Sequence, residues 1–362
     1  MPGQQAAWSA EFRLALACCE RNFADRPQSA MQTPQVDWAG FLQLVRFHRI
    51  EGLAWNSLST SERIPAEVRL ALSAAAAEIA AQNLIAAAAS RELLDRFADR
   101  GIPLLFLKGL TAGALAYGKA SLKAAIDIDL LIDPADLASA ADLLRQTGFQ
   151  PTTPDAADND SLCRWHGGWK ESIWAKRSPQ LQIDLHTRTS DNRQLIPGID
   201  VHSSCQKVSV GDGIALPTLA DEELFAYLAV HGASSAWFRL KWISDFAGLL
   251  VGRSADDIGA LYGASQDLGA GRAAGQALLL ADSLFNTLEA APRLRDELRA
   301  DRGTRRLTQA AYRQVTAKPR EPTEVRWGTL AIHWTQFLLL PGLGYKLSEL
   351  LRQAKGMPDP QR

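Results

Sequence analysis

Two aspartates, Asp127 and Asp129, interrupt the apolar run AAIDIDLLID at residues 124–133. An ionised carboxylate inside a buried strand is costly unless a cation or a hydrogen-bond donor accompanies it. Alternate residues of a strand share a face, so both carboxylates are expected on one face, with Cα atoms ~6.6 Å apart. Carboxylate oxygens are ligands that Mg²⁺ and Mn²⁺ prefer. The run therefore predicts an acidic face that binds Mg²⁺ or Mn²⁺.

The residues between these acids are expected on the opposite face of the strand, packed against helices; they are Ile126, Ile128 and Leu130. The alternative is an edge strand whose two acids face water. The apolar residues LLI that follow Asp129 favour a buried strand over an exposed one.

A third aspartate, Asp184, has the same local pattern in the run LQIDLHTRT at residues 181–189. If this strand lies beside the first, the three carboxylates converge, because neighbouring strands are ~4.8 Å apart. Such a cluster could hold two cations that bridge triphosphate oxygens and lower the pKa of an attacking hydroxyl. Asp184 is then expected to be a general base or a metal-bound activator. His186 shares its face and could contact the phosphates, or it could make only a structural hydrogen bond.

The run IPLLFLKGLTAGALAYG at residues 102–118 predicts a short buried strand, a turn and a helix. Gly109 allows a ligand to approach the backbone closely. The free N–H groups at the start of the helix, the amine of Lys108 and the hydroxyl of Thr111 all favour an anion there. We therefore expect a phosphate group at this turn. An ordinary strand-to-helix turn would show the same pattern.

The chain changes pattern along its length, with helical spacing of apolar residues at both ends and mixed strands and helices between them. The expected boundaries are 1–100 for an N-terminal helical region, 101–216 for a sheet domain, 217–350 for a C-terminal helical domain and 351–362 for a frayed tail. The sequence thus predicts an α+β fold in which a small mixed sheet is flanked by two helical regions.

Within the sheet domain, period-two patterns and turn residues predict the individual elements. We expect strands at 102–107 and 126–132, a helix at 133–148 that Asp133 caps, and a hairpin of 170–177 with 181–189. Thr218 or Asp221 is expected to cap the start of the helices that follow.

Composition narrows the class of protein. The 362 residues include 39 Lys and Arg and 40 Asp and Glu, so the net charge of −1 gives no indication of binding to long nucleic acid. Four scattered cysteines and a start that lacks the basic region of a signal peptide favour a cytoplasmic protein. No run is uniformly apolar over 18 residues, and LAIHWTQFLLLPGLGYKL at 330–347 comes closest. No transmembrane span is therefore expected.

The ordered motifs LKGLTAGALAYG, KAAIDIDLLIDPADLASAADLLRQTGF and QIDLHTRT resemble the DNA polymerase β-type nucleotidyltransferase superfamily. More narrowly, they resemble the family of uncharacterised nucleotidyltransferases, which also has a helical segment similar to LAVHGASSAWFRLKWISDFAGLL. The resemblance runs from about residue 40 to 250. It implies a sheet of the nucleotidyltransferase type, with Gly109 in the phosphate turn, Asp127 and Asp129 as the metal pair, and Asp184 as the third acid.

The chain departs from the superfamily at two positions. Leu110 stands where serine or glycine is usual, so Thr111 would have to supply the hydroxyl. Lys123 is the nearest basic residue before the acidic strand, where relatives often have arginine, and lysine lacks the bidentate fork of arginine.

The helical segment in this family closes over the sheet, so Arg239 or Lys241 could bind the triphosphate. The two residues are two positions apart and do not share a helix face. Asp245 could instead neutralise Lys241 through an i, i+4 pair.

The resemblance and the residues together predict a Mg²⁺-dependent nucleotidyltransferase. It would move a nucleoside monophosphate from an NTP to an acceptor, which is a small molecule, a peptide or natural product, or a protein. Two alternatives stay open. The same acidic cradle could transfer a phosphoryl or other phosphate-activated group, or the fold could serve as a non-catalytic binding module.

Overall fold

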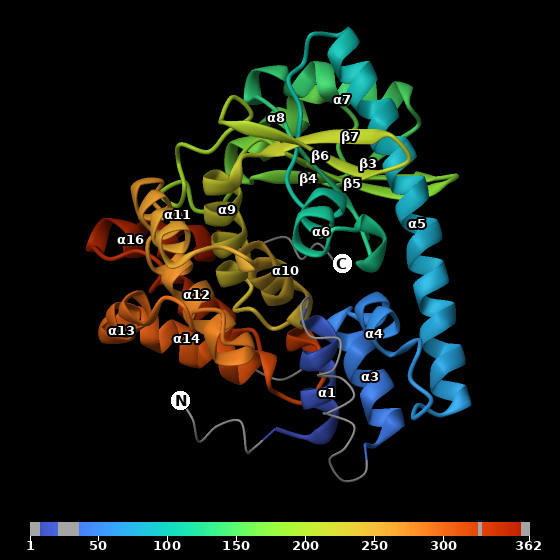
Figure 1. The fold of residues 1–362 in the computed structure, drawn as a ribbon. Coiled ribbons are helices and arrows are strands. Elements are labelled where there is room, and N and C mark those ends of the chain that lie inside the picture. The colour runs from blue at the N-terminus through green and yellow to red at the C-terminus, as the bar shows by residue number, and fades with distance from the viewer. Residues whose placement is uncertain (1–7, 21–35, 325–327, 356–362) are drawn as a thin grey trace.

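A sheet layer lies above a helical bundle, and the long helix α5 runs along one side of both (Figure 1). The computed structural model describes residues 8–20, 36–324 and 328–355. Arg49, with a φ of 56°, separates two helices within the apolar pattern at 38–58. The described helices before the sheet are α1 (Ala10–Cys19), α3 (Trp38–His48), α4 (Glu51–Leu58) and α5 (Ala66–Asp99).

The main sheet has five strands in the order β1-β2-β5-β4-β3. β2 and β5 are parallel, whereas the other neighbouring pairs are antiparallel, so the sheet is mixed. The predicted hairpin is confirmed as β4 and β5. The strands are β1 (Leu105–Phe106), β2 (Ile128–Leu131), β3 (Gln150–Thr153), β4 (Glu171–Arg177) and β5 (Gln180–His186).

The first two strands are shorter than predicted, and this changes the position of one apolar side chain. Asp127 precedes β2 instead of lying within it. Ile126 was expected in the core but is 47% exposed, because the strand begins only at Ile128. Ile128 and Leu130 are buried as predicted.

Helices connect the strands on both sides of the sheet. Figure 1 shows α7 and α8 on one side and α6 and α9 on the other. Asp133 accepts a hydrogen bond from the backbone N–H of Ala135, as expected of an N-cap. The connecting elements are α6 (Leu110–Tyr117), η2 (Ala120–Leu122), η3 (Pro134–Asp136), α7 (Leu137–Gln146) and α8 (Asn159–Gly168).

A second hairpin, β6 (Cys205–Gly211) with β7 (Ile214–Leu219), was not predicted. Its strands pack beside β1, α5 and α6. The sequence does contain a signal for this hairpin, because Asp-Gly pairs favour tight hairpin turns. In the structure Gly211, Asp212 and Gly213 all have positive φ. Thr218 is consequently a strand residue, and α9 starts at Asp221 without a side-chain cap.

Helices form the remainder of the described chain. α16 ends at Ala354, and residues 356–362 of the predicted tail lie outside the described residues. The elements are α9 (Asp221–Ser234), α10 (Leu240–Leu250), α11 (Ala255–Asp267), α12 (Arg272–Phe285), α13 (Pro292–Ala300), α14 (Arg302–Val315), η4 (Pro322–Glu324), α15 (Leu330–Gln336) and α16 (Leu343–Ala354).

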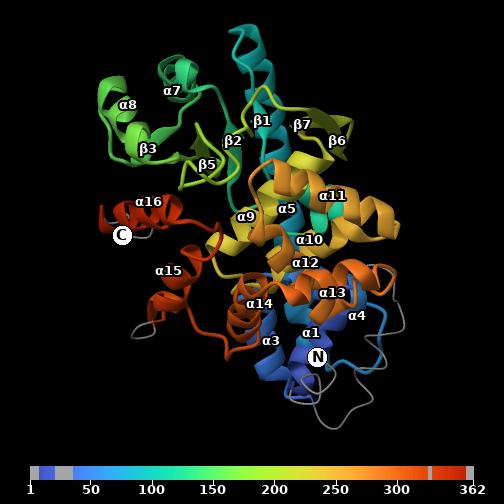
Figure 2. The same cartoon turned by 90° about the vertical axis from the view of Figure 1, so that its left-hand side faces the viewer.

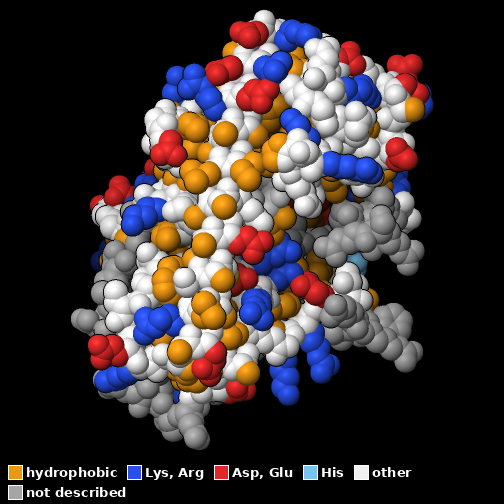
Figure 3. Space-filling view, turned by 90° about the vertical axis from the view of Figure 1, so that its right-hand side faces the viewer, with side chains coloured by type: hydrophobic (Ala, Val, Ile, Leu, Met, Phe, Trp, Pro, Cys, Tyr) orange, Lys and Arg blue, Asp and Glu red, His pale blue; other side chains and the backbone are white. Residues whose placement is uncertain are grey.

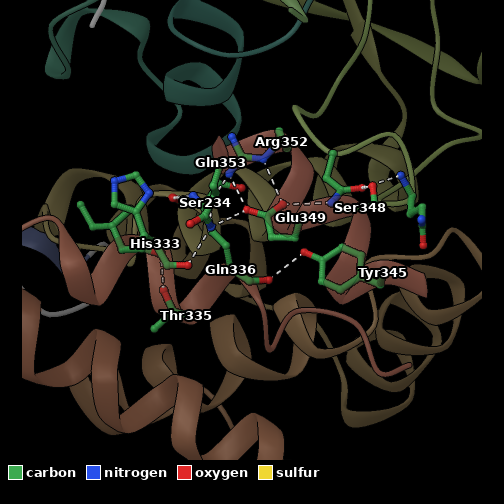
Figure 4. A network of polar contacts seen from close by, with 12 residues as sticks. Ser234, His333, Thr335, Gln336, Tyr345, Ser348, Glu349, Arg352 and Gln353 are labelled. Carbon is green, nitrogen blue, oxygen red and sulfur yellow. Dashed lines mark hydrogen bonds and ion pairs between the residues drawn. The ribbon is translucent and has the colours of Figure 1, made fainter. Parts of the chain in front are cut away.

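A polar network fastens the last two helices to the rest of the chain (Figure 4). Glu349 of α16 accepts a hydrogen bond from Asn192, in the loop after β5, at 3.0 Å. Gln336 of α15 donates to the backbone oxygen of Ser234 in α9 at 2.8 Å. Figure 2 shows α16 between α15 and the sheet, so these helices bridge the two layers.

The apolar face of the sheet packs against α5, α7 and α8, in a core that includes Trp174, Ile183 and Leu185. A second core holds the helical bundle together. Side chains alternate along each strand, so burial of this face directs Asp129, Asp184 and His186 to the other face.

One described helix, α5, is long and apolar enough to cross a membrane, by its length and composition alone. This helix is not the apolar run at 330–347 that comes closest to a span in the sequence. In the structure α5 packs its inner face on this chain, where Asn83 and Ser90 are buried. Its outer face is exposed.

Candidate active site

A lysine and two aspartates form the centre of the acidic face. The amine of Lys108, just after β1, lies 2.6 Å from the carboxylate of Asp129 and 3.7 Å from that of Asp127. The side chain of Asp129 is completely buried. One amine therefore contacts both members of the predicted metal pair.

These contacts set the charge states of the pair. Burial alone would raise the pKa of Asp129, but the charge of Lys108 and the hydrogen bond from His186 lower it to about 2. Burial would lower the pKa of Lys108, yet Asp127 and Asp129 raise it well above its usual value. Both Lys108 and Asp129 are therefore ionised at neutral pH.

Asp184 lies directly opposite Asp129 in the register of the parallel strands β2 and β5. Ligand atoms of Asp129, Asp184 and His186 all lie within 4.8 Å of one another. Burial, followed by the negative charges of Asp129 and Asp127, raises the pKa of Asp184 well above its usual value. A divalent cation would relieve this repulsion, and the oxygen donors present suit Mg²⁺.

His186 is enclosed between two carboxylates. Its Nε2 lies 3.1 Å from Asp129, and its Nδ1 lies 3.1 Å from Glu171. The side chain is 1% exposed. This arrangement matches the structural alternative for His186, because the ring orients Asp129 and is not open to a phosphate.

Glu171 and Lys170 were missed in the sequence analysis. They form an ion pair of 2.8 Å, and Lys170 and His186 together outweigh burial and lower the pKa of Glu171 to about 2. The predicted hairpin contained the signal, since Glu171 is the cross-strand partner of His186. A carboxylate opposite a histidine on an acidic face could have been included in the site.

A cleft opens beside the acidic residues, and helices α9 and α10 form its other wall. Its lining includes Gly109, Lys123, Leu228, His231 and Trp242, together with Lys108, Asp127, Lys241 and Asp245. Burial, helped by the positive charges of Lys123 and Arg49, lowers the pKa of Lys241 to about 7. Both walls of the cleft thus carry both signs of charge, with Lys108 and Asp127 on the sheet side and Lys241 and Asp245 on the helical side.

The pairing expected between Asp245 and Lys241 is wrong. Asp245 forms a buried ion pair with Lys123 and accepts a hydrogen bond from the hydroxyl of Tyr117 at 2.9 Å. Lys123 therefore lines the cleft with its charge already matched, whereas Lys241 has no such partner among the described residues.

The two other basic residues near this region differ in their surroundings. Arg239 donates to the backbone oxygen of Phe47, pairs with Glu321 and stacks on the ring of Phe47, so the structure does not bring it to the cleft. Arg49 was not predicted. It lies close enough for the charge of Asp127 to raise its pKa, although burial lowers that pKa overall.

The turn predicted between the first strand and the next helix precedes α6. Gly109 has a φ of 71° and precedes the first residue of the helix. Thr111 is completely buried, and its hydroxyl donates to the backbone oxygen of Lys108 at 3.4 Å. The hydroxyl of Thr111 therefore stabilises the turn, and the backbone N–H groups remain the donors for an anion.

Gly109→Ala is expected to destabilise the chain by about 1 kcal/mol, because an alanine Cβ disfavours positive φ. Space is not the reason, since the nearest atom to an added Cβ is 3.6 Å away. Chemical denaturation measures the effect. Gly167→Ala is the control, because its added Cβ meets nothing within 4 Å and its φ is ordinary. Equal losses in the two variants would contradict the conformational explanation.

Residues 34–286 match the family described as uncharacterised nucleotidyltransferase. The chain belongs to this family. The matched range contains every cleft residue described above. No curated protein and no solved structure matches this member of the family.

Proposed function

We propose that this chain is a Mg²⁺- or Mn²⁺-dependent nucleotidyltransferase of the DNA polymerase β type, which moves a nucleoside monophosphate from an NTP to an acceptor. The observation that carries the proposal is the register of β2 and β5. It sets Asp129, the ion-pair partner of Lys108, opposite Asp184. The family to which the chain belongs supports the same reaction class.

Asp129 and Asp184, with Asp127 beside them, would hold the cation. The raised pKa of Asp184 supports this fit, because crowded carboxylates favour a positive charge among them. When bound, the cation would neutralise phosphate charge and lower the pKa of an attacking hydroxyl.

The remaining residues divide into phosphate binders and a base. Lys108, released from its two aspartates, would contact the phosphates together with the N–H groups at the start of α6. Lys241 reaches the same cleft from α10. Asp184, opposite Asp129, would act as the general base or as a metal-bound activator of the attacking hydroxyl.

The acceptor, in this proposal, is a small molecule, a peptide or a protein that enters between the sheet and the helices α9 and α10. Its attacking group is a hydroxyl or a phosphate. The near-neutral charge of the chain, −1, argues against a long nucleic acid as acceptor.

Titration calorimetry with α,β-methylene-ATP tests the proposal before the acceptor is known. We expect Mg²⁺-dependent binding that weakens about 100-fold in Asp129→Asn and Asp184→Asn. Asp160→Asn, on α8 across the sheet, is the exposed control and should bind normally. Absence of Mg²⁺-dependent binding, or equal binding by all variants, would contradict the proposal and favour a binding module.

Labelled ATP then identifies the group transferred. The chain is incubated with ATP and a pool of cellular peptides and small molecules. Label from the α-phosphate on a product supports nucleotidyl transfer. Label only from the γ-phosphate would mean that the cradle transfers a phosphoryl group, and the proposal would fail.

Lys241→Met is expected to stabilise the metal-free chain most at low pH. The pKa of Lys241 is about 7 in the folded chain against 10.5 as its ordinary value, so the wild type carries the full penalty for a buried charge below pH 7. The penalty fades as pH rises toward 10.5, on the order of 1.4 kcal/mol per pH unit. Thermal unfolding at pH 6 and pH 9 measures it, with the exposed Lys207→Met as control. A gain independent of pH would contradict the assignment.

A further inference from the structure

The outer face of α5 has a regular line of exposed residues. They recur at intervals of three and four positions and are Glu67, Leu70, Ala74, Ala77, Ala81, Leu84, Ala88 and Arg91. Leu70 is 72% exposed and Leu84 is 58% exposed. Figure 3 shows hydrophobic side chains along this face. Alternating intervals of three and four define the seam of a coiled coil. The seam residues of α5 are exposed, so none of the described helices covers them.

The seam is complementary to itself when turned end for end. With the midpoint between Ala77 and Ala81 as centre, Leu70 falls opposite Ala88 and Ala74 falls opposite Leu84. Each large side chain thus meets a small one. Such alternation lets two helices interdigitate without voids or clashes. We infer that this face binds a second copy of the chain, with the two α5 helices antiparallel.

The charges at the ends of the seam agree with this orientation. Glu67 lies at one end and Arg91 at the other, so an antiparallel pair places each glutamate opposite an arginine. A parallel pair would place like charges together. The end of the seam at Ala88 also borders a groove of about 270 Å³, lined by Ile85, Lys176 and other residues, into which Leu70 of the second copy would fit.

The seam is long enough for a reversible dimer. From Leu70 to Ala88 it spans about 27 Å, at ~1.5 Å per residue. A single helix pair of this length lies at the low end of specific interfaces, so we expect weak and reversible association. The inner face of α5 holds the loop before Asp127, because Asn83 bonds Ala120, Lys123 and Ala125. Dimer formation would therefore stabilise α5, the helix that holds the loop beside the cleft.

Sedimentation of the full chain between about 1 and 100 µM tests the inference. The mass should rise from 39.4 kDa toward twice that value. Ala77→Glu places a charge at the centre of the seam and should weaken association at least about 30-fold. Gln82→Glu adds the same charge to the same helix outside the seam and should leave it unchanged. The circular dichroism spectra of the dilute wild type, Ala77→Glu and Gln82→Glu should match, because both replaced side chains are exposed in the single chain.

A charge exchange tests the orientation. Glu67→Arg alone and Arg91→Glu alone should each weaken association, and the double variant should recover it, because the pairs re-form with reversed sign. A wild-type chain that stays monomeric at 100 µM would overturn the inference, as would association unaffected by Ala77→Glu. If a monomeric chain instead binds vesicles of phosphatidylglycerol and phosphatidylethanolamine through this face, α5 is a membrane surface and the inference is wrong.

Discussion

The free energy of unfolding is expected to fall by about 3 kcal/mol when Asp129 is replaced by alanine. Asp129 is the 2.6 Å partner of Lys108, and its own side chain is completely buried. Its removal leaves the ammonium of Lys108, whose side chain is 15% exposed, beside Asp127 at 3.7 Å as the remaining charge partner. The same change removes one of the two facing carboxylates that would hold Mg²⁺. Binding of Mg²⁺ with α,β-methylene-ATP should therefore be lost as well.

Chemical denaturation and titration calorimetry separate these two effects. Asp127→Ala should reduce stability less, because the side chain of Asp127 is 28% exposed and its contact with Lys108 is longer. Adding Lys108→Met to Asp129→Ala should recover most of the stability but none of the binding. If the double variant is no more stable than Asp129→Ala, the loss does not come from an unpaired buried ammonium.

Asp184→Asn is expected to raise the melting temperature of the metal-free chain and to abolish its response to Mg²⁺. Burial and the charges of Asp129 and Asp127 disfavour the ionised form of Asp184 in the folded state. A neutral amide removes that repulsion but also removes a ligand. Asp184 thus lowers the stability of the metal-free chain but supplies a carboxylate ligand to the proposed site.

The pH dependence distinguishes this explanation from better packing. Folding raises the pKa of Asp184 above its ordinary 3.8, so the folded wild type binds the proton more tightly and loses stability as pH rises above about 4. The advantage of asparagine should be absent at pH 4 and grow toward neutral pH. Melting curves at pH 4 and pH 7.5 measure it. An equal advantage at both values would contradict the electrostatic origin.

The motifs themselves were readable from local sequence. Period-two patterns predicted the hairpin β4-β5, and a glycine between a strand pattern and a helix pattern predicted the turn before α6. These features depend on the backbone preferences of a few neighbouring residues, so the local sequence is enough to predict them. The aspartates stood out because charge inside an apolar run requires a partner.

The partners were decided by tertiary contacts. The pairing of Asp245 with Lys123 joins residues that are 122 positions apart, so no i, i+4 rule could find it. Arg49 is brought near Asp127 by packing of the N-terminal helices, and Arg239 is held elsewhere by Phe47 and Glu321. The ion-pair partner of a long side chain depends on which residues the folded chain brings within its reach, so local sequence does not predict it.

By itself, the sequence determined which residues could do chemistry, their order along the chain and the α+β pattern around them. Only the tertiary structure decided that Asp129 faces Asp184, because the register of two parallel strands depends on how both faces of the sheet are covered. It also enclosed His186 between Asp129 and Glu171 and left the seam of α5 exposed. Spacing along one element is a local property, whereas burial and charge pairing depend on what packs against it.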